Sequence, residues 1–219
     1  MKTQIKIIAT IAICTTLAGI TTASVHAKEA TKPSPAGSSQ SSAIYAVSPT
    51  TNETFSFATG NAGSTETNTK LLGYVDWLQC RQFNNETWVI NSFATSYLGT
   101  KRNMAIQCGS ASTQGYLHIA DGDSKHQQGW RGRITQANPG DNTDVWDDFM
   151  WWSAQQAWNA PEISKDQGNY KICRSTPIKM YGRDSSGSLV LKFTFRPTII
   201  WSVSANRLIT AIPSTTASC

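Results

Sequence analysis

The sequence lacks the patterns by which several classes of protein are recognised. It has no Cys-x-x-Cys pair and no Cys/His cluster at ligand spacing, so we expect neither a metal site nor a cofactor. Beyond residue 27 it has no apolar segment long enough to cross a membrane. It also has no internal repeat, which argues against a solenoid or other repeat architecture.

The opening segment predicts export. Residues 1–27 combine a basic start at Lys2 and Lys6, a mostly apolar run and small residues around Ala27, which is the pattern of a cleavable signal peptide. We therefore expect a secreted, extracellular protein, the alternative being a retained anchor. Removing this segment leaves 17 basic and 14 acidic residues. That mild excess fits an anionic ligand or contact with the cell envelope, without specifying either.

Four cysteines remain after processing, and an even number in an exported chain predicts two disulfides. The spacing leaves all three connectivities open. A bond to the last residue would also hold the C-terminus in place. The four candidates are Cys80, Cys108, Cys173 and Cys219.

Composition divides the remainder into two parts. Residues 28–69 are rich in Ser and Thr and predict a disordered or loosely structured tether, although 44–58 contains two short strand-like runs. Residues 70–219 are long enough for a single domain. Within it, the spacing of apolar residues predicts a helix over 144–158.

The end of the chain predicts strands, separated by turn residues. They cover 169–174, 177–182, 189–195, 198–203 and 207–212. Helices followed by strands predict an α+β fold, with N-terminal helices packed on a C-terminal antiparallel sheet of four or five strands.

The candidate catalytic residues concentrate in one basic segment, residues 118–133. His118 and His126 lie there, and neutral and protonated imidazoles can act as general base and general acid in phosphodiester cleavage without a metal. Fixed cations stabilise the charge that develops on the phosphoryl oxygens. We expect four cations to bind an anionic substrate: Lys125, Arg131, Arg133 and Arg174. Two alternatives are ordinary surface histidines and a calcium loop beginning at Asp121, which lacks the glycine and distal glutamate of that motif.

Tryptophans support another interpretation. Trp146, Trp151, Trp152 and Trp158 all fall in the predicted helix. Trp146 lies on its apolar stripe, whereas Trp151 lies off the stripe and is expected to be the more exposed. Exposed tryptophans can form a platform for sugar rings, so the alternative function is a secreted, non-catalytic module that binds the cell wall or another surface.

Three motifs resemble the toxin ribonucleases of the barnase–EndoU–colicin–RelE superfamily. The first is GYLHI…H…W, from Gly115 to Trp130; the second is FTFRPT, and the third is RLITAIPS near the C-terminus. The similarity spans residues 110–214. It implies helices packed on a small antiparallel sheet that forms an RNA cleft, and a separate immunity protein as a partner.

The resemblance also implies roles for individual residues. His118 is the expected catalytic histidine and His126 the second acid/base group. Arg196 is expected to hold the scissile phosphate, and Thr210 to donate a hydrogen bond to it. The expected activity is metal-independent cleavage of RNA through a 2′,3′-cyclic phosphate.

Overall fold

The computed structural model describes residues 44–57, 70–122 and 125–219. The predicted signal peptide at 1–27 and most of the predicted tether lie outside the described residues. The described helices are α1 (Tyr74–Trp77), η1 (Leu78–Gln82), α2 (Gly115–Leu117), η2 (His118–Gly122), α3 (Lys125–Ala137), η3 (Thr143–Val145) and α4 (Trp146–Asn159). The strands are β1 (Tyr45–Val47), β2 (Thr54–Ser56), β3 (Val89–Tyr97), β4 (Thr100–Gln107), β5 (Ile163–Gly168), β6 (Lys171–Ser175), β7 (Ile178–Arg183), β8 (Leu189–Phe195), β9 (Thr198–Ser202) and β10 (Arg207–Ile212).

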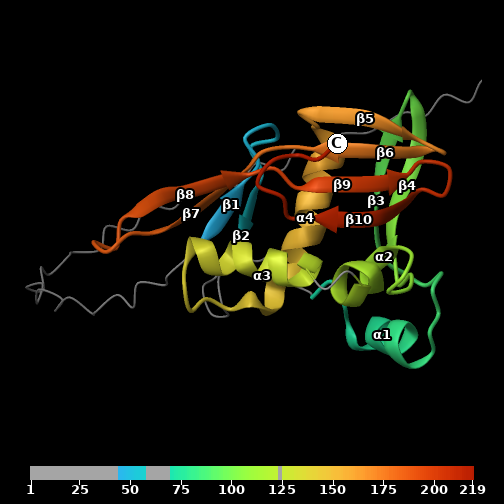
Figure 1. Ribbon diagram of the computed structural model, residues 1–219, viewed down its shortest axis with the longest axis horizontal. Coiled ribbons are helices and arrows are strands. Elements are labelled where there is room, and N and C mark those ends of the chain that lie inside the picture. The colour runs from blue at the N-terminus through green and yellow to red at the C-terminus, as the bar shows by residue number, and fades with distance from the viewer. Residues whose placement is uncertain (1–43, 58–69, 123–124) are drawn as a thin grey trace, which may run out of the picture. The chain divides into compact units, whose positions relative to one another are not determined.

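The larger sheet has six strands in the order β3-β4-β10-β9-β6-β5 (Figure 1). Its neighbouring strands are antiparallel except β4 and β10, which run parallel. A parallel pair needs a long crossover, and here the crossover contains α2, α3 and α4. The predicted α+β class is confirmed. Helices α2, α3 and α4, however, lie between strands β4 and β5 of the larger sheet in the chain, instead of preceding all of its strands.

The smaller sheet has the order β2-β1-β7-β8. The predicted C-terminal strands are therefore divided between two sheets. Strand β1 pairs with β7, with Ala46 opposite Met180. Ile44, Ala46 and Phe57 are buried in the core. The folded unit thus begins before residue 70, where the sequence analysis starts the domain, because these short apolar runs find a partner strand far along the chain.

Helix α4 is buried on more than one side. Phe149 packs against Phe55 and Phe57, whereas Trp151 packs against Phe93 and Trp201 of the larger sheet. The expectation that Trp151 is exposed is wrong, since only 5% of its surface is accessible. A single apolar stripe predicts one buried face, but α4 contacts two sets of aromatic residues.

Both disulfides form, as the cysteine count predicts. Cys80–Cys108 joins η1 to the residue that follows β4, and Cys173–Cys219 joins β6 to the C-terminal residue. The second bond holds the C-terminal segment beside the larger sheet, where Ser218 N–H also donates to Thr198 Oγ1. Two disulfides are typical of proteins that fold in an oxidising compartment.

Candidate active site

Just before His118, two backbone segments pass very close to each other, residues 107–109 and residues 114–115. Gly109 and Gly115 both have positive φ, +63° and +78°. A Cβ atom on Gly109 would lie 1.7 Å from the carbonyl oxygen of Gln114, and one on Gly115 would lie 2.6 Å from that of Gln107. Only glycine fits either position without displacing the backbone. The Cys80–Cys108 disulfide lies immediately before this crossing, so the start of α2 is held firmly.

His118 is the first residue of η2, and its ring is held by the backbone. Its Nδ1 lies 3.0 Å from the carbonyl oxygen of Ala111. A carbonyl only accepts hydrogen bonds, so in the neutral ring Nδ1 carries the proton and Nε2 has the free lone pair. Gly122 packs against this contact, since a Cβ there would lie 2.9 Å from His118 Nδ1.

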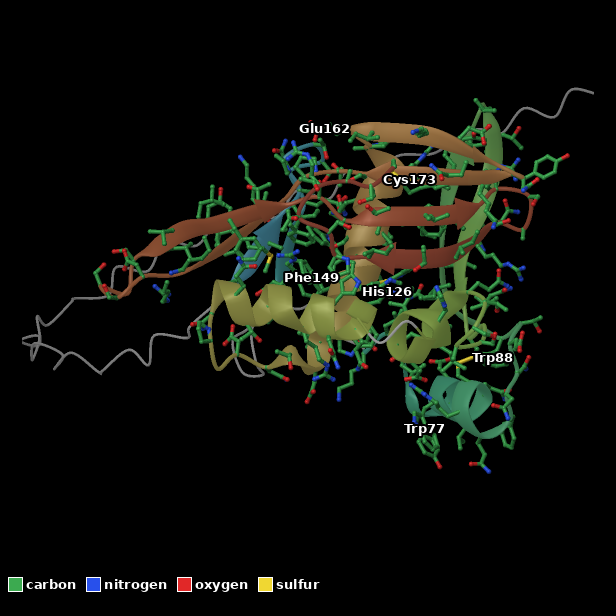
Figure 2. All side chains as sticks on the ribbon, viewed as in Figure 1. Trp77, Trp88, His126, Phe149, Glu162 and Cys173 are labelled. Atoms are coloured by element: carbon green, nitrogen blue, oxygen red, sulfur yellow. A yellow bond between two sulfur atoms is a disulfide. The ribbon has the colours of Figure 1, made fainter. Side chains whose placement is uncertain are left out.

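His126 faces His118 from the first turn of α3. The two ring centroids are 5.8 Å apart, and the planes meet at 78°. The side chain of His126 is buried, and its Nδ1 makes a long contact of 3.5 Å with Thr210 Oγ1 on β10. Helix α3 is tied to this strand because Trp130 Nε1 donates to the carbonyl oxygen of Ala211. The structure therefore brings together His118, His126 and Thr210, and Figure 2 labels the position of His126.

Arg196, the expected phosphate ligand, is not brought to this cluster. Its guanidinium donates two hydrogen bonds of 3.1 Å to Glu162, just before β5. Figure 2 labels Glu162 and His126 at clearly separate places in the molecule. Arg196 is therefore an ion-pair partner of Glu162 and does not share a phosphate with the histidines.

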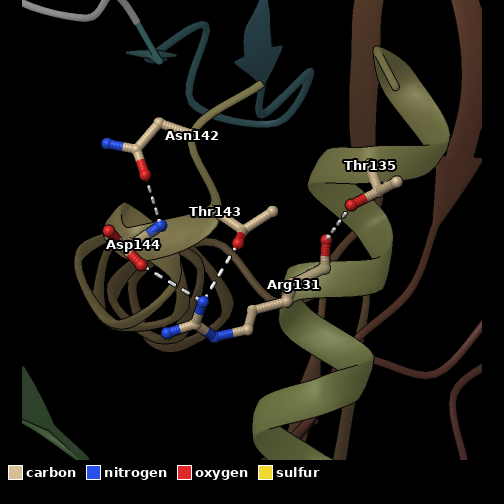
Figure 3. A network of polar contacts seen from close by, with 5 residues as sticks. All are labelled: Arg131, Thr135, Asn142, Thr143 and Asp144. Carbon is tan, nitrogen blue, oxygen red and sulfur yellow. Dashed lines mark hydrogen bonds and ion pairs between the residues drawn. The ribbon is translucent and has the colours of Figure 1, made fainter. Parts of the chain in front are cut away.

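Two predicted substrate cations stabilise the fold. Arg131 Nη1 donates to Thr143 Oγ1 and Asp144 Oδ1, at 3.0 and 3.2 Å, and so links α3 to the start of α4 (Figure 3). Arg133 donates to the carbonyl oxygen of Pro213 and lies over the Phe195 ring. Burial lowers the pKa of its guanidinium.

Of the other two predicted cations, only Arg174 has a described side chain, and that side chain is engaged elsewhere. The Arg174 guanidinium stacks over Trp158, 4.1 Å from the ring centroid, and burial lowers its pKa. The side chain of Lys125 lies outside the described residues.

Arg207, on β10, is a basic residue that the sequence analysis did not single out. In the register of β10, Arg207 lies opposite Ser202 and Thr210 opposite Ile200. Ser202 and Ile200 share one face of β9, so Arg207 and Thr210 share a face as well. Arg207 Nη1 donates to Gln107 Oε1 at 3.2 Å, and Gln107 lies beside the glycine crossing. The Nε of Arg207 is buried and has no hydrogen-bond partner among the described residues.

A second group of titratable residues connects α2 to α4. Tyr116 OH donates to Asp147 Oδ2, and burial raises the pKa of both groups. Burial, and then the charge of Asp147, raise the pKa of Asp148 to about 7. Asp148 Oδ1 accepts the backbone N–H of Leu71 at 2.6 Å. These contacts hold α2, and therefore His118, against the core.

The tryptophan platform finds no support at its proposed position. Trp151 is in the core, and Trp152 is half-buried against Phe55 and Phe149. Two aromatic rings packed in this way present no flat surface to a sugar.

Basic residues outnumber acidic residues on the strands of the larger sheet. The strands of the larger sheet carry one acidic residue, Asp166, against six basic ones: Lys101, Arg102, Lys165, Lys171, Arg174 and Arg207. The excess of five positive charges is spread over both faces of the sheet, since consecutive residues such as Lys101 and Arg102 point to opposite faces.

No described helix is long and apolar enough to span a membrane. The described residues also contain no group of three or more His, Cys, Asp or Glu side chains positioned to hold a metal ion. Comparisons with protein-family models, with curated proteins and with solved structures find no match to this chain.

Proposed function

We propose that this protein is a secreted, metal-independent ribonuclease in which His118 and His126 act as base and acid. The observation that carries the proposal is the facing pair of imidazole rings, 5.8 Å apart, next to Thr210 on a basic sheet. One neutral and one protonated imidazole is the state that acid/base catalysis requires.

The chemical step uses both rings. His118 Nε2 takes the proton of a ribose 2′-hydroxyl, since Nδ1 is held by the Ala111 carbonyl. The 2′-oxygen then forms a bond to phosphorus while the bond from phosphorus to the 5′-oxygen breaks. His126, protonated, gives its proton to the departing 5′-oxygen. The products are a 2′,3′-cyclic phosphate and a 5′-hydroxyl, and one proton is taken for each one given.

Arg207 and Thr210 would stabilise the phosphoryl oxygens. Both lie on one face of β10, and Thr210 already contacts His126. Arginine is suited to phosphate because its planar guanidinium donates several parallel hydrogen bonds. Arg207 thus replaces Arg196 in the role that the resemblance implies. The two disulfides agree with export into an oxidising compartment. A separate immunity protein would protect the producing cell from the nuclease before export.

The test measures cleavage of a single-stranded RNA by the purified, oxidised protein in excess chelator. We expect His118→Ala and His126→Ala each to lower the rate by roughly 10²- to 10⁴-fold. The matched control is Gln128→Ala, an exposed position on the same helix. Thermal midpoints of all variants should stay close together, since catalysis and not folding is removed.

Product analysis completes this experiment. A substrate with a single 2′-deoxyribose at the cleaved position should be resistant, and its ribose counterpart should yield a 2′,3′-cyclic end. Undiminished cleavage by His118→Ala, or cleavage only after a divalent metal is added, would refute the proposal.

A further inference from the structure

A cavity of about 670 Å³ lies at the end of the larger sheet where three turns meet. The turns connect β3 to β4, β5 to β6 and β9 to β10. The lining residues that matter here are Tyr97, Leu98, Arg102, Tyr170, Lys171 and Ser204. None of them belongs to the histidine cluster, and the cavity is a separate site.

Two large side chains lie on these turns in an unfavourable backbone conformation. Leu98 has φ +48° and is 86% exposed; Tyr170 has φ +59° and is 75% exposed. Two-residue hairpin turns with positive φ at both positions favour Asn-Gly, because bulky residues are strained there. Neither side chain gains burial that would offset the strain. Exposed, strained residues that converge on one cavity indicate a ligand that contacts them.

The lining of the cavity carries two cations, Arg102 and Lys171, and one carboxylate, Asp166. The Arg102 guanidinium lies 5.9 Å from the centroid of the Tyr97 ring. Arg102 Nη1 is held in place by the Val203 carbonyl and Asn206 Oδ1, both at 2.7 Å. The carboxylate of Asp166 accepts the Gly168 N–H within its own turn. Two cations against one carboxylate, beside the exposed side chains of Leu98 and Tyr170, suit an anionic ligand that has a planar or apolar part.

We propose that this cavity binds a nucleotide of single-stranded RNA at a distance from the scissile bond, with its base stacked on Tyr170 and its phosphate near Arg102 and Lys171. This inference rests on the proposed function for the identity of the ligand. Stacking on an exposed aromatic ring beside cations is how single-stranded nucleic acid is bound without sequence readout. A neutral glycan would use the aromatic ring but not the cations.

The decisive variant is Tyr170→Gly, because it creates the Asn-Gly turn that this hairpin geometry prefers. Its thermal midpoint should be unchanged or higher, so loss of binding cannot be attributed to unfolding. The matched control is Tyr74→Ala, which removes a tyrosine of similar exposure, 77%, from α1.

The assay is fluorescence anisotropy of a labelled single-stranded RNA, with each change made in the His118→Ala background to prevent cleavage. We expect Tyr170→Gly to weaken binding by about ten-fold or more, and Tyr74→Ala to leave it unchanged. Lys171→Ala should reduce the dependence of affinity on salt, because one phosphate contact is lost.

The outcomes separate the two proposals. Wild-type protein that binds RNA through Tyr170 without cleaving it would refute the ribonuclease and leave this site intact. If the wild-type protein cleaves RNA, and Tyr170→Gly leaves the affinity for RNA unchanged, this site alone is refuted. Tyr170-dependent binding of a neutral cell-wall glycan, without binding of RNA, would overturn the assignment of the ligand.

Discussion

Replacing Gly122 by alanine tests whether the backbone contact of His118 matters for activity. The added Cβ would lie 2.3 Å from the Ala111 carbonyl oxygen and 2.9 Å from His118 Nδ1, which are the two partners of one hydrogen bond. The carbonyl would have to retreat by about 1 Å to restore an ordinary contact distance. A displacement of that size at a catalytic group can cost roughly 10²-fold in rate.

Stability should fall as well, but by less. Overpacking of this kind costs about 1–3 kcal/mol, and each kcal/mol lowers the thermal midpoint of a domain of this size by about 2–4 °C. The assay is the initial rate of RNA cleavage over a range of substrate concentrations. We expect kcat to fall while KM changes little, since the phosphate and base contacts are made elsewhere.

The control for this substitution is Gly132→Ala. Gly132 lies within α3, where a Cβ would have no atom within 4 Å. Alanine there should leave cleavage unchanged and stabilise the helix by about 0.5–1 kcal/mol. If Gly122→Ala cleaves RNA as fast as Gly132→Ala, the contact between His118 and Ala111 does not position a catalytic base.

Two further predictions concern stability. The pKa of Asp148 is raised to about 7 in the folded protein, so the folded state holds a proton that the unfolded chain has lost, and the free energy of unfolding should fall as pH rises from about 4 through 7. Asp148→Asn should make this fall shallower in thermal melts, and an identical slope would contradict the assignment. Replacing Cys173 and Cys219 by serine removes a bond across 46 residues and should cost about 4 kcal/mol in urea denaturation. An unchanged denaturation midpoint would show that the bond adds no constraint.

The regular parts of the fold follow from local pattern. The predicted helix over 144–158 corresponds to α4 at Trp146–Asn159, and the C-terminal strands occur where apolar and turn residues alternate. Their division between two sheets does not follow from local pattern, because pairing depends on residues far apart in sequence. Strand β1, at Tyr45–Val47, finds its partner in β7, more than 130 positions later.

The two histidines approach each other because they lie in separate helices. Their spacing of eight residues places them on no shared face of a short helix. In the structure His118 begins η2 and His126 lies in the separate helix α3, so the rings approach from different elements. The glycines at 109 and 115 are the sequence signal for the crossing, but their partners, the carbonyls of Gln107 and Gln114, are identified only by the fold.

The assignment of Arg207 as the proposed phosphate-binding residue depends on one irregularity in β10. Simple alternation places Arg207 and Thr210 on opposite faces of the strand. The register shifts between Leu208 and Thr210, and this shift returns both residues to one face. Arg196 lies in one of the motifs that carry the resemblance, yet its guanidinium is hydrogen-bonded to Glu162. A single bulge therefore decides whether Arg207 shares a face of β10 with Thr210, the contact of His126.

Net charge is a poor guide to the ligand of this chain, because the fold separates charges that composition adds together. The helical segments hold five aspartates and four basic residues, and two of those basic residues, Arg81 and Arg131, pair with Asp121 and Asp144. The larger sheet keeps its excess of five positive charges. An approaching polyanion responds to the local potential and not to the sum over the molecule. A modest total of +3 after processing is thus compatible with a sheet that is locally basic, and both proposed sites include residues of that sheet.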